Sequence, residues 1–161
     1  MILTLQAYTI FHVVISLVAI LAGLIVLRGW LTARRLDGWT LIFLLFTLAT
    51  SVTGFFFPFH GFTPAIGTGI LSVIVLAAAF AGLYVFHLEG PWRWIYLVSA
   101  AIALYLNVFV LIIQAFLKIP PLHALAPNGN EPPFAIVQGI VLVLFVIGGF
   151  MAVRRYRPVA G

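Results

Sequence analysis

Five long apolar stretches follow one another along the chain and are separated by short polar gaps. They cover about residues 7–28, 39–57, 65–87, 93–117 and 134–153. Each stretch is close to the ~20 residues that cross ~30 Å of hydrocarbon as an α-helix. A lipid-facing strand or loop would leave backbone groups unpaired, so helices are favoured. The pattern predicts an all-α fold, a single transmembrane domain of five helices over residues 1–161.

Proline placement agrees with these limits. All nine prolines fall outside the stretches: Pro58, Pro64, Pro91, Pro120, Pro121, Pro127, Pro132, Pro133 and Pro158. Proline inside a helix removes a hydrogen bond and clashes with the preceding turn. None of the five predicted helices is therefore interrupted.

The basic residues are divided unevenly between the two sides of such a bundle. Lys118, the only lysine, lies in a gap on one side, and the seven arginines lie in or beside gaps on the other: Arg28, Arg34, Arg35, Arg93, Arg154, Arg155 and Arg157. Loops rich in Arg and Lys remain in the cytoplasm. We therefore expect the N-terminus outside and the C-terminus in the cytoplasm.

Composition narrows the class further. With 65% hydrophobic residues, 7% charged residues and a mean hydropathy of +1.26, a soluble domain is excluded. The net charge of +5 suits anionic lipid headgroups of the bilayer and does not indicate nucleic-acid binding. The absence of cysteine excludes disulfides and thiolate sites. The N-terminus has no positive charge before its first apolar run, unlike a signal peptide.

Polar side chains within the predicted helices gather in the outer half of the bilayer. Asn107, Gln114 and Lys118 are spaced by seven and four, which places them on one helix face. We expect them to join His12, Ser16 and Gln138 around an outward-facing polar pocket that binds a small ligand or a partner: this is the leading hypothesis. The alternative is that such amides only hydrogen-bond neighbouring helices.

His12 is the strongest candidate for metal chemistry. It shares a helix seam with three small residues, Ser16, Ala19 and Gly23, so we expect it to point into the bundle. There it either bonds a facing hydroxyl or ligates haem iron or a transition metal. Three residues of the outer loops complete a candidate metal site with His12: His60, His123 and Glu131. Glu131 also suits the N-terminus of the fifth helix.

The sequence gives little support for an enzyme. The three acidic residues, Asp37, Glu89 and Glu131, are divided between the two sides of the bundle, whereas acid–base catalysis needs a positioned pair. The four tryptophans map to the predicted cytoplasmic boundary, where we expect them to anchor the protein among headgroups: Trp30, Trp39, Trp92 and Trp94. The long loop before the fifth helix should form a short apolar turn against the bundle.

Three segments carry a resemblance to a known family. They are residues 50–58 (TSVTGFFFP), 103–110 (ALYLNVFV) and 126–134 (APNGNEPPF). Together they are similar to an uncharacterised family of small bacterial multi-pass inner-membrane proteins. The resemblance implies a bacterial inner membrane and no particular chemistry.

Three functions remain open from the sequence. The first is the outward-facing ligand or partner pocket. The second is a haem- or metal-binding redox protein that uses His12. The third is an accessory subunit that packs onto a larger membrane complex or assembles with copies of itself through its apolar inner halves.

Overall fold

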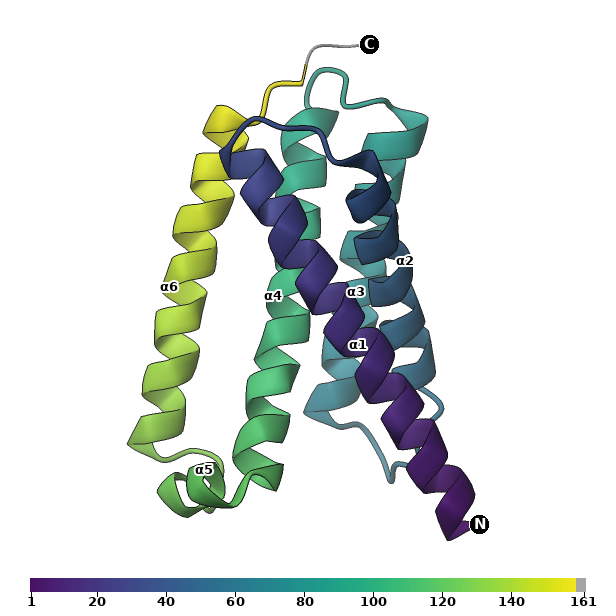
Figure 1. Cartoon of the computed structure of the whole chain (residues 1–161), viewed down its shortest axis with the longest axis vertical. Coiled ribbons are helices and arrows are strands. Elements are labelled where there is room, and N and C mark those ends of the chain that lie inside the picture. The colour runs from purple at the N-terminus through teal and green to yellow at the C-terminus, as the bar shows by residue number, and fades with distance from the viewer. Residues whose placement is uncertain (159–161) are drawn as a thin grey trace.

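The computed structural model describes residues 1–158 and shows an all-α bundle (Figure 1). Its elements are α1 (Ile2–Leu31), α2 (Asp37–Gly54), α3 (Pro64–Phe80) with a π-helical turn at Ala81–Val85, α4 (Trp92–Lys118), α5 (Pro120–Leu125) and α6 (Pro132–Arg155). Five of them are long and apolar enough to cross a membrane: α1, α2, α3 with its π-helical turn, α4 and α6. The predicted all-α bundle of five spanning helices is confirmed.

Several boundaries differ from the prediction. α2 ends at Gly54 and the following phenylalanines form turns, because Pro58 disfavours helical geometry in the residue before it. α3 ends in the π-helical turn before His87, whose φ is +49°. The apolar turn expected before α6 is the short helix α5. It begins with Pro120 and Pro121, a residue type suited to the first turn of a helix.

The loop prolines mark where helices begin. Pro64 occupies the first turn of α3, and the Thr63 hydroxyl accepts a hydrogen bond from the Ile66 amide at 3.3 Å. Pro132 starts α6 in the same way. Proline has no amide proton, so it leaves no donor unpaired in a first turn. The prolines therefore define helix starts as well as gaps.

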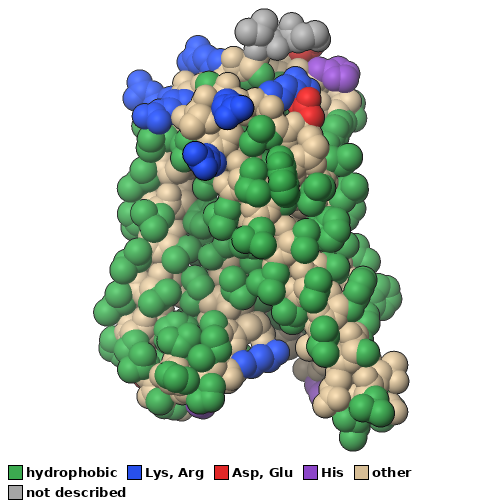
Figure 2. Space-filling view, in the orientation of Figure 1, with side chains coloured by type: hydrophobic (Ala, Val, Ile, Leu, Met, Phe, Trp, Pro, Cys, Tyr) green, Lys and Arg blue, Asp and Glu red, His purple; other side chains and the backbone are tan. Residues whose placement is uncertain are grey.

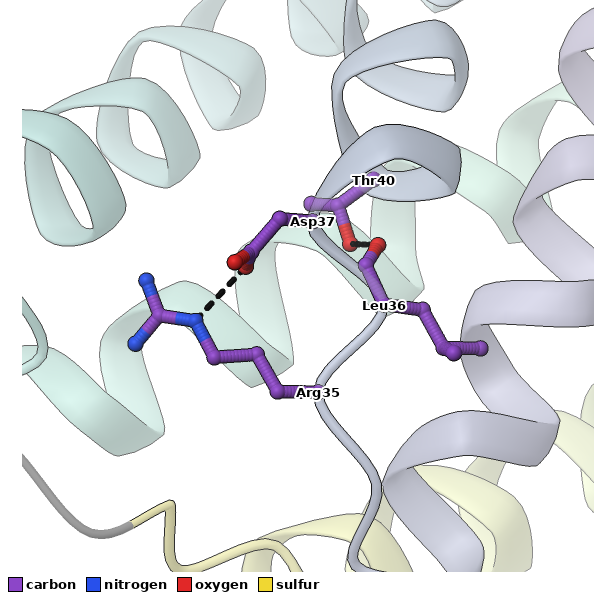
Figure 3. A network of polar contacts seen from close by, with 4 residues as sticks. All are labelled: Arg35, Leu36, Asp37 and Thr40. Atoms are coloured by element: carbon purple, nitrogen blue, oxygen red, sulfur yellow. Dashed lines mark hydrogen bonds and ion pairs between the residues drawn. The ribbon is translucent and has the colours of Figure 1, made fainter. Parts of the chain in front are cut away.

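One end of the bundle carries the arginines, and we call it the arginine end; the opposite end is the distal end. Figure 2 shows most of the basic surface gathered at the arginine end. There α1 and α6 end and α2 and α4 begin. Arg35 lies in the loop that precedes α2, and its Nε donates to Oδ1 of Asp37, the first residue of α2, at 2.6 Å (Figure 3). That hydrogen bond raises the pKa of Arg35 above its ordinary value.

The buried core occupies the half of the bundle nearest the arginine end. Its members come from α1, α2, α3, α4 and α6, and the largest are Trp30, Phe43, Leu44, Tyr96, Leu97 and Leu104. Trp30 is 2% exposed and packs edge-on against Tyr96, with 5.7 Å between ring centroids. The expectation that Trp30 anchors the protein among headgroups is wrong, because its indole is enclosed between helices.

Arg93 joins α4 to the end of α6. Its Nη1 donates to the carbonyl oxygens of Val153 at 2.7 Å and Tyr156 at 2.8 Å. The last carbonyls of a helix have no partner within the helix and carry partial negative charge. The guanidinium therefore satisfies the C-terminal end of α6 from a neighbouring helix.

Candidate functional site

One face of α4 runs from the arginine end to the distal end and defines the site. Successive residues on it are three or four apart, so they form a single line along the helix: Tyr96, Ala100, Ala103, Asn107, Leu111, Gln114 and Lys118. We call this line the central stripe. At its middle, Asn107 Nδ2 donates to the Thr47 hydroxyl of α2 at 3.1 Å. At the level of Asn107 the stripe therefore faces α2.

Burial along the central stripe changes abruptly past Asn107. Tyr96 is 1% exposed and Ala100 and Ala103 are fully buried, whereas Leu111 is 38% exposed and both Gln114 and Lys118 are exposed. Since the face is the same, the helices opposite it must diverge toward the distal end. Figure 2 shows the surface hollowed there, between the lobe around α5 and the N-terminal end of α1. We call this space the distal hollow.

Two polar contacts seal the bundle on the arginine side of the distal hollow. One is the bond between Asn107 and Thr47, whose side chain is fully buried. The other joins the hydroxyls of Ser51 on α2 and Ser72 on α3 at 2.9 Å. Ser51 and Ser72 are also buried. Asn107 therefore forms an interhelical hydrogen bond, as expected under the alternative to the ligand pocket.

His12 lies on α1 beside the end of α2. Its Nδ1 is 2.7 Å from Thr53 Oγ1, and the Thr53 hydroxyl donates to the Ala49 carbonyl at 2.7 Å. The direction of the hydrogen bond between Thr53 and His12 is set by the tautomer of the imidazole. The other ring nitrogen, Nε2, has no hydrogen-bond partner among the residues that the structure describes. His12 is half-buried, so this nitrogen is the one left for a ligand, a metal or haem iron.

Tyr8 and Phe57 hold the imidazole in place. The Tyr8 hydroxyl donates to the Thr53 carbonyl at 2.6 Å. The Phe57 ring contacts both Tyr8 and His12, with 5.0 Å between ring centroids in each pair. Tyr8 is one helical turn before His12, so four-residue spacing on α1 was the signal that sequence reasoning missed. Thr53, the direct partner of His12, had no such local signal.

Lys118 supplies positive charge to the distal hollow. It is the last residue of α4 and is exposed at the distal end. Among residues 1–158 the one ion pair joins Arg35 and Asp37, so Lys118 has no carboxylate partner there. Ser16, one turn beyond His12 on α1, is half-buried and donates to the Val13 carbonyl at 2.8 Å. The structure thus brings α1 and α4 to the same space.

Gln138 lies elsewhere. Its Nε2 donates at 3.2 Å to the carbonyl oxygen of Phe109, which lies on the face of α4 opposite the central stripe. The side chain is 9% exposed, and its Oε1 is buried with no hydrogen-bond partner in the part of the chain that the structure describes. The expectation that Gln138 shares a pocket with Asn107 and Gln114 is therefore wrong, because α4 separates it from them.

The candidate metal set is not brought together. Within residues 1–158, no group of three or more His, Asp or Glu side chains is placed to hold a metal ion. His60 lies in the loop between α2 and α3, and His123 lies on α5, where its Nδ1 donates to the Phe116 carbonyl at 3.2 Å. His12 is held by Thr53. Each histidine therefore has a separate environment.

Glu131 orders the loop before α6. It occupies the N-cap position, and its carboxylate accepts hydrogen bonds from the backbone amides of Asn128 at 2.8 Å and Asn130 at 3.1 Å. Desolvation acts to raise the pKa of Glu131, but these backbone donors outweigh it and the pKa is lowered. The carboxylate is thus used by its own loop.

We found no matching family model, curated protein sequence or solved structure for this chain. The exposed Gln114 amide and Lys118 ammonium group lie on the α4 side of the distal hollow, and the half-buried His12 imidazole lies on α1 beside the end of α2. Such a set can bind a ligand through a few directed polar contacts.

Proposed function

We propose that this chain is a multi-pass protein of a bacterial inner membrane, with its distal end facing outward. The support for the orientation is that all seven arginines lie at the opposite end, and arginine-rich ends remain in the cytoplasm. The support for a bacterial inner membrane is the resemblance carried by residues 50–58, 103–110 and 126–134.

The proposed activity is binding of a small ligand or a partner segment in the distal hollow. One observation carries it: the central stripe of α4 is buried at Ala100 and Ala103 and exposed at Gln114 and Lys118. Ligand sites are concave and mostly apolar, with a few placed polar groups. In the hollow, Lys118 would attract a negative or acceptor group, Gln114 offers both a donor and an acceptor, and His12 Nε2 would supply one further hydrogen-bonding atom.

Binding is favoured over catalysis because no carboxylate orients the imidazole. The group bonded to His12 is the Thr53 hydroxyl. Asp37 is paired with Arg35 at the arginine end, and the Glu131 carboxylate accepts bonds from its own loop. General acid–base catalysis needs a second titratable group positioned beside the first.

Cysteine accessibility tests whether water reaches the distal hollow. The chain contains no cysteine, so a single Gln114→Cys variant gives one reporter without further changes. Ile136→Cys is the matched control. Ile136 is 58% exposed and lies on α6 near the same depth, because Phe134 packs on Phe116 of α4. A membrane-impermeant maleimide applied from outside should label Gln114→Cys rapidly and Ile136→Cys slowly, since the latter thiol faces lipid.

Equal labelling rates for the two thiols would contradict a hydrated hollow. Labelling of Gln114→Cys from the arginine side alone would instead contradict the orientation. The two parts of the proposal are thereby tested separately.

Retention of a bound molecule tests the binding step. Wild-type protein and the Gln114→Ala, Lys118→Ala double variant are purified from the same membranes and weighed by native mass spectrometry. We expect an additional mass on the wild type that the double variant has lost, while His60→Ala, changed in a separate exposed loop, keeps it. Identical spectra for the wild type and the double variant would refute binding through these side chains.

A further inference from the structure

The ends of α1 and α6 meet at the arginine end, although they are more than a hundred residues apart in sequence. Leu27 Cδ1 of α1 lies 3.8 Å from where a Cβ on Gly148 of α6 would be. Arg155 Nη1 donates to the Leu31 carbonyl at 3.4 Å. We call this contact the α1–α6 junction.

Three arginines from two helices are concentrated at the α1–α6 junction. Arg28 is in the last turn of α1, and Arg154 and Arg155 are in the last turn of α6. All three are exposed. The ion pair of Arg35 with Asp37 is the only one in the described residues, so no carboxylate neutralises these three. Arg155 donates to the Leu31 carbonyl at the end of α1, so Arg28 and Arg154 are the two that remain to bind an anion.

Helix geometry places Arg28 and Arg154 on the same flank of the junction. Both helices end at the arginine end and therefore run parallel. The α1 face toward α6 carries Leu27 and Leu31, and the α6 face toward α1 carries Gly148 and Arg155. From these faces, the 100° step per residue of a right-handed helix turns Arg28 and Arg154 to one side. Figure 2 shows the gathering of basic side chains at this end.

Exposed apolar side chains lie directly below the two guanidiniums on the same flank. Leu24, one turn before Arg28, is 45% exposed, and Ile147, two turns before Arg154, is 50% exposed. Arg154 itself extends over the Phe150 ring, with Cζ 5.5 Å from the centroid. A free phosphate ion needs only the guanidiniums, whereas a phospholipid uses the apolar surface as well. Basic sites between helices at the cytoplasmic side are a known mode of headgroup recognition.

We propose that the α1–α6 junction binds an anionic phospholipid, with the headgroup phosphate on Arg28 and Arg154 and an acyl chain along Leu24 and Ile147. Guanidiniums suit this role because their planar donors match phosphate oxygens in pairs. The site lies at the end opposite the distal hollow. Its failure in a test would therefore leave the proposed ligand function unaffected.

Electron paramagnetic resonance of spin-labelled lipids tests the site in the full chain. The protein is reconstituted into phosphatidylcholine nanodiscs that contain a spin-labelled phosphatidylglycerol or, for comparison, a spin-labelled phosphatidylcholine. We expect a saturable, motionally restricted population of phosphatidylglycerol that phosphatidylcholine lacks. Arg28→Gln and Arg154→Gln should each weaken its association about fivefold, the contribution of one arginine near anionic lipid.

Arg35→Gln is the matched control. It removes one positive charge from the same end, but the guanidinium that it removes is already paired with Asp37. We expect less than a twofold change. Equal losses in all three variants would mean a diffuse surface charge, and displacement of the lipid by millimolar inorganic phosphate would mean a soluble-anion site. Either result, or equal restriction of the two lipids, would overturn the proposal.

Discussion

The two halves of the bundle are built from the same helices but packed differently. Near the arginine end, side chains of α1, α2, α3, α4 and α6 enclose one another, and several are fully buried. Toward the distal end, the first fourteen residues of the chain include no buried side chain, and α4 buries only Phe116 beyond Asn107. The helices are therefore closely packed at one end and diverge at the other.

Small residues explain much of this contrast. Gly23 approaches α2 and α4 so closely that an added Cβ would lie 2.5 Å from Leu104 Cδ1 and 2.9 Å from the Phe43 ring. Such residues let helix backbones approach in membranes, where dispersion contacts rather than water exclusion hold helices together. The distal parts of α1 and α4 instead carry longer side chains that face outward or into the hollow. Rigid and open regions are therefore specified by residue size.

The strongest test of the comparison uses two leucines of α4. Leu104 is fully buried, whereas Leu111, seven residues on, is 38% exposed. Leu104→Ala should lower the free energy of unfolding by about 3 kcal/mol, because a cavity remains in the packed half. Leu111→Ala should cost less than about 1 kcal/mol, since little packing is lost. Unfolding in mixed micelles measures both, and similar losses would mean that the two halves are equally packed.

Two glycines sharpen the comparison from the opposite direction. Gly23→Val should destabilise the bundle by about 2 kcal/mol, because Leu104 and Phe43 have no room to move. Gly139→Val on α6 is the control. An added Cβ there has nothing within 4 Å, so we expect a change within about 0.5 kcal/mol. Thermal unfolding in detergent distinguishes them, and a tolerated Gly23→Val would argue against a close-packed seam.

The smallest expected effect concerns the polar contact at the boundary between the halves. A double-mutant cycle of Asn107→Ala and Thr47→Ala should give a coupling of about 0.6 kcal/mol, typical of interhelical hydrogen bonds in membranes. Each single variant should also label faster at a Gln114→Cys reporter if this bond limits how far the hollow opens. Zero coupling with unchanged labelling would mean that the contact does not close the bundle.

The spacing of apolar and polar residues predicts the helices and which residues share a helix face. On α1, the seam of small residues also continues beyond Gly23. The seam of His12, Ser16, Ala19 and Gly23 continues with the same spacing to Val26 and Trp30. Following the seam two turns beyond Gly23 predicts that Trp30 is buried. Composition pointed the other way, because tryptophan near a span end is usually interfacial. For Trp30, position on the helix face decided and residue type did not.

The sequence predicts one wall of the distal hollow but not the hollow itself. The spacing of Asn107, Gln114 and Lys118 predicted their common face, and the structure agrees, since Asn107 reaches α2 along that face. Whether the opposite helices stay close or diverge depends on contacts between segments far apart in the chain. The prediction that Gln138 lies in the same pocket is wrong for the same reason. The sequence predicts how deep Gln138 lies along α6, but not that it contacts Phe109 of α4.

Arg93 has a consequence for how deeply α6 sits. Most of the α6 surface is apolar and exposed, so contact with lipid alone does not fix its position along the bundle axis. The two bonds from Arg93 to the carbonyls of Val153 and Tyr156 exist at only one vertical position. The Arg93 guanidinium thus helps to fix how deep α6 lies in the bundle, although Arg93 is sixty residues before Val153 in the sequence. The position of α6 along the bundle axis is therefore fixed in part by a side chain of α4.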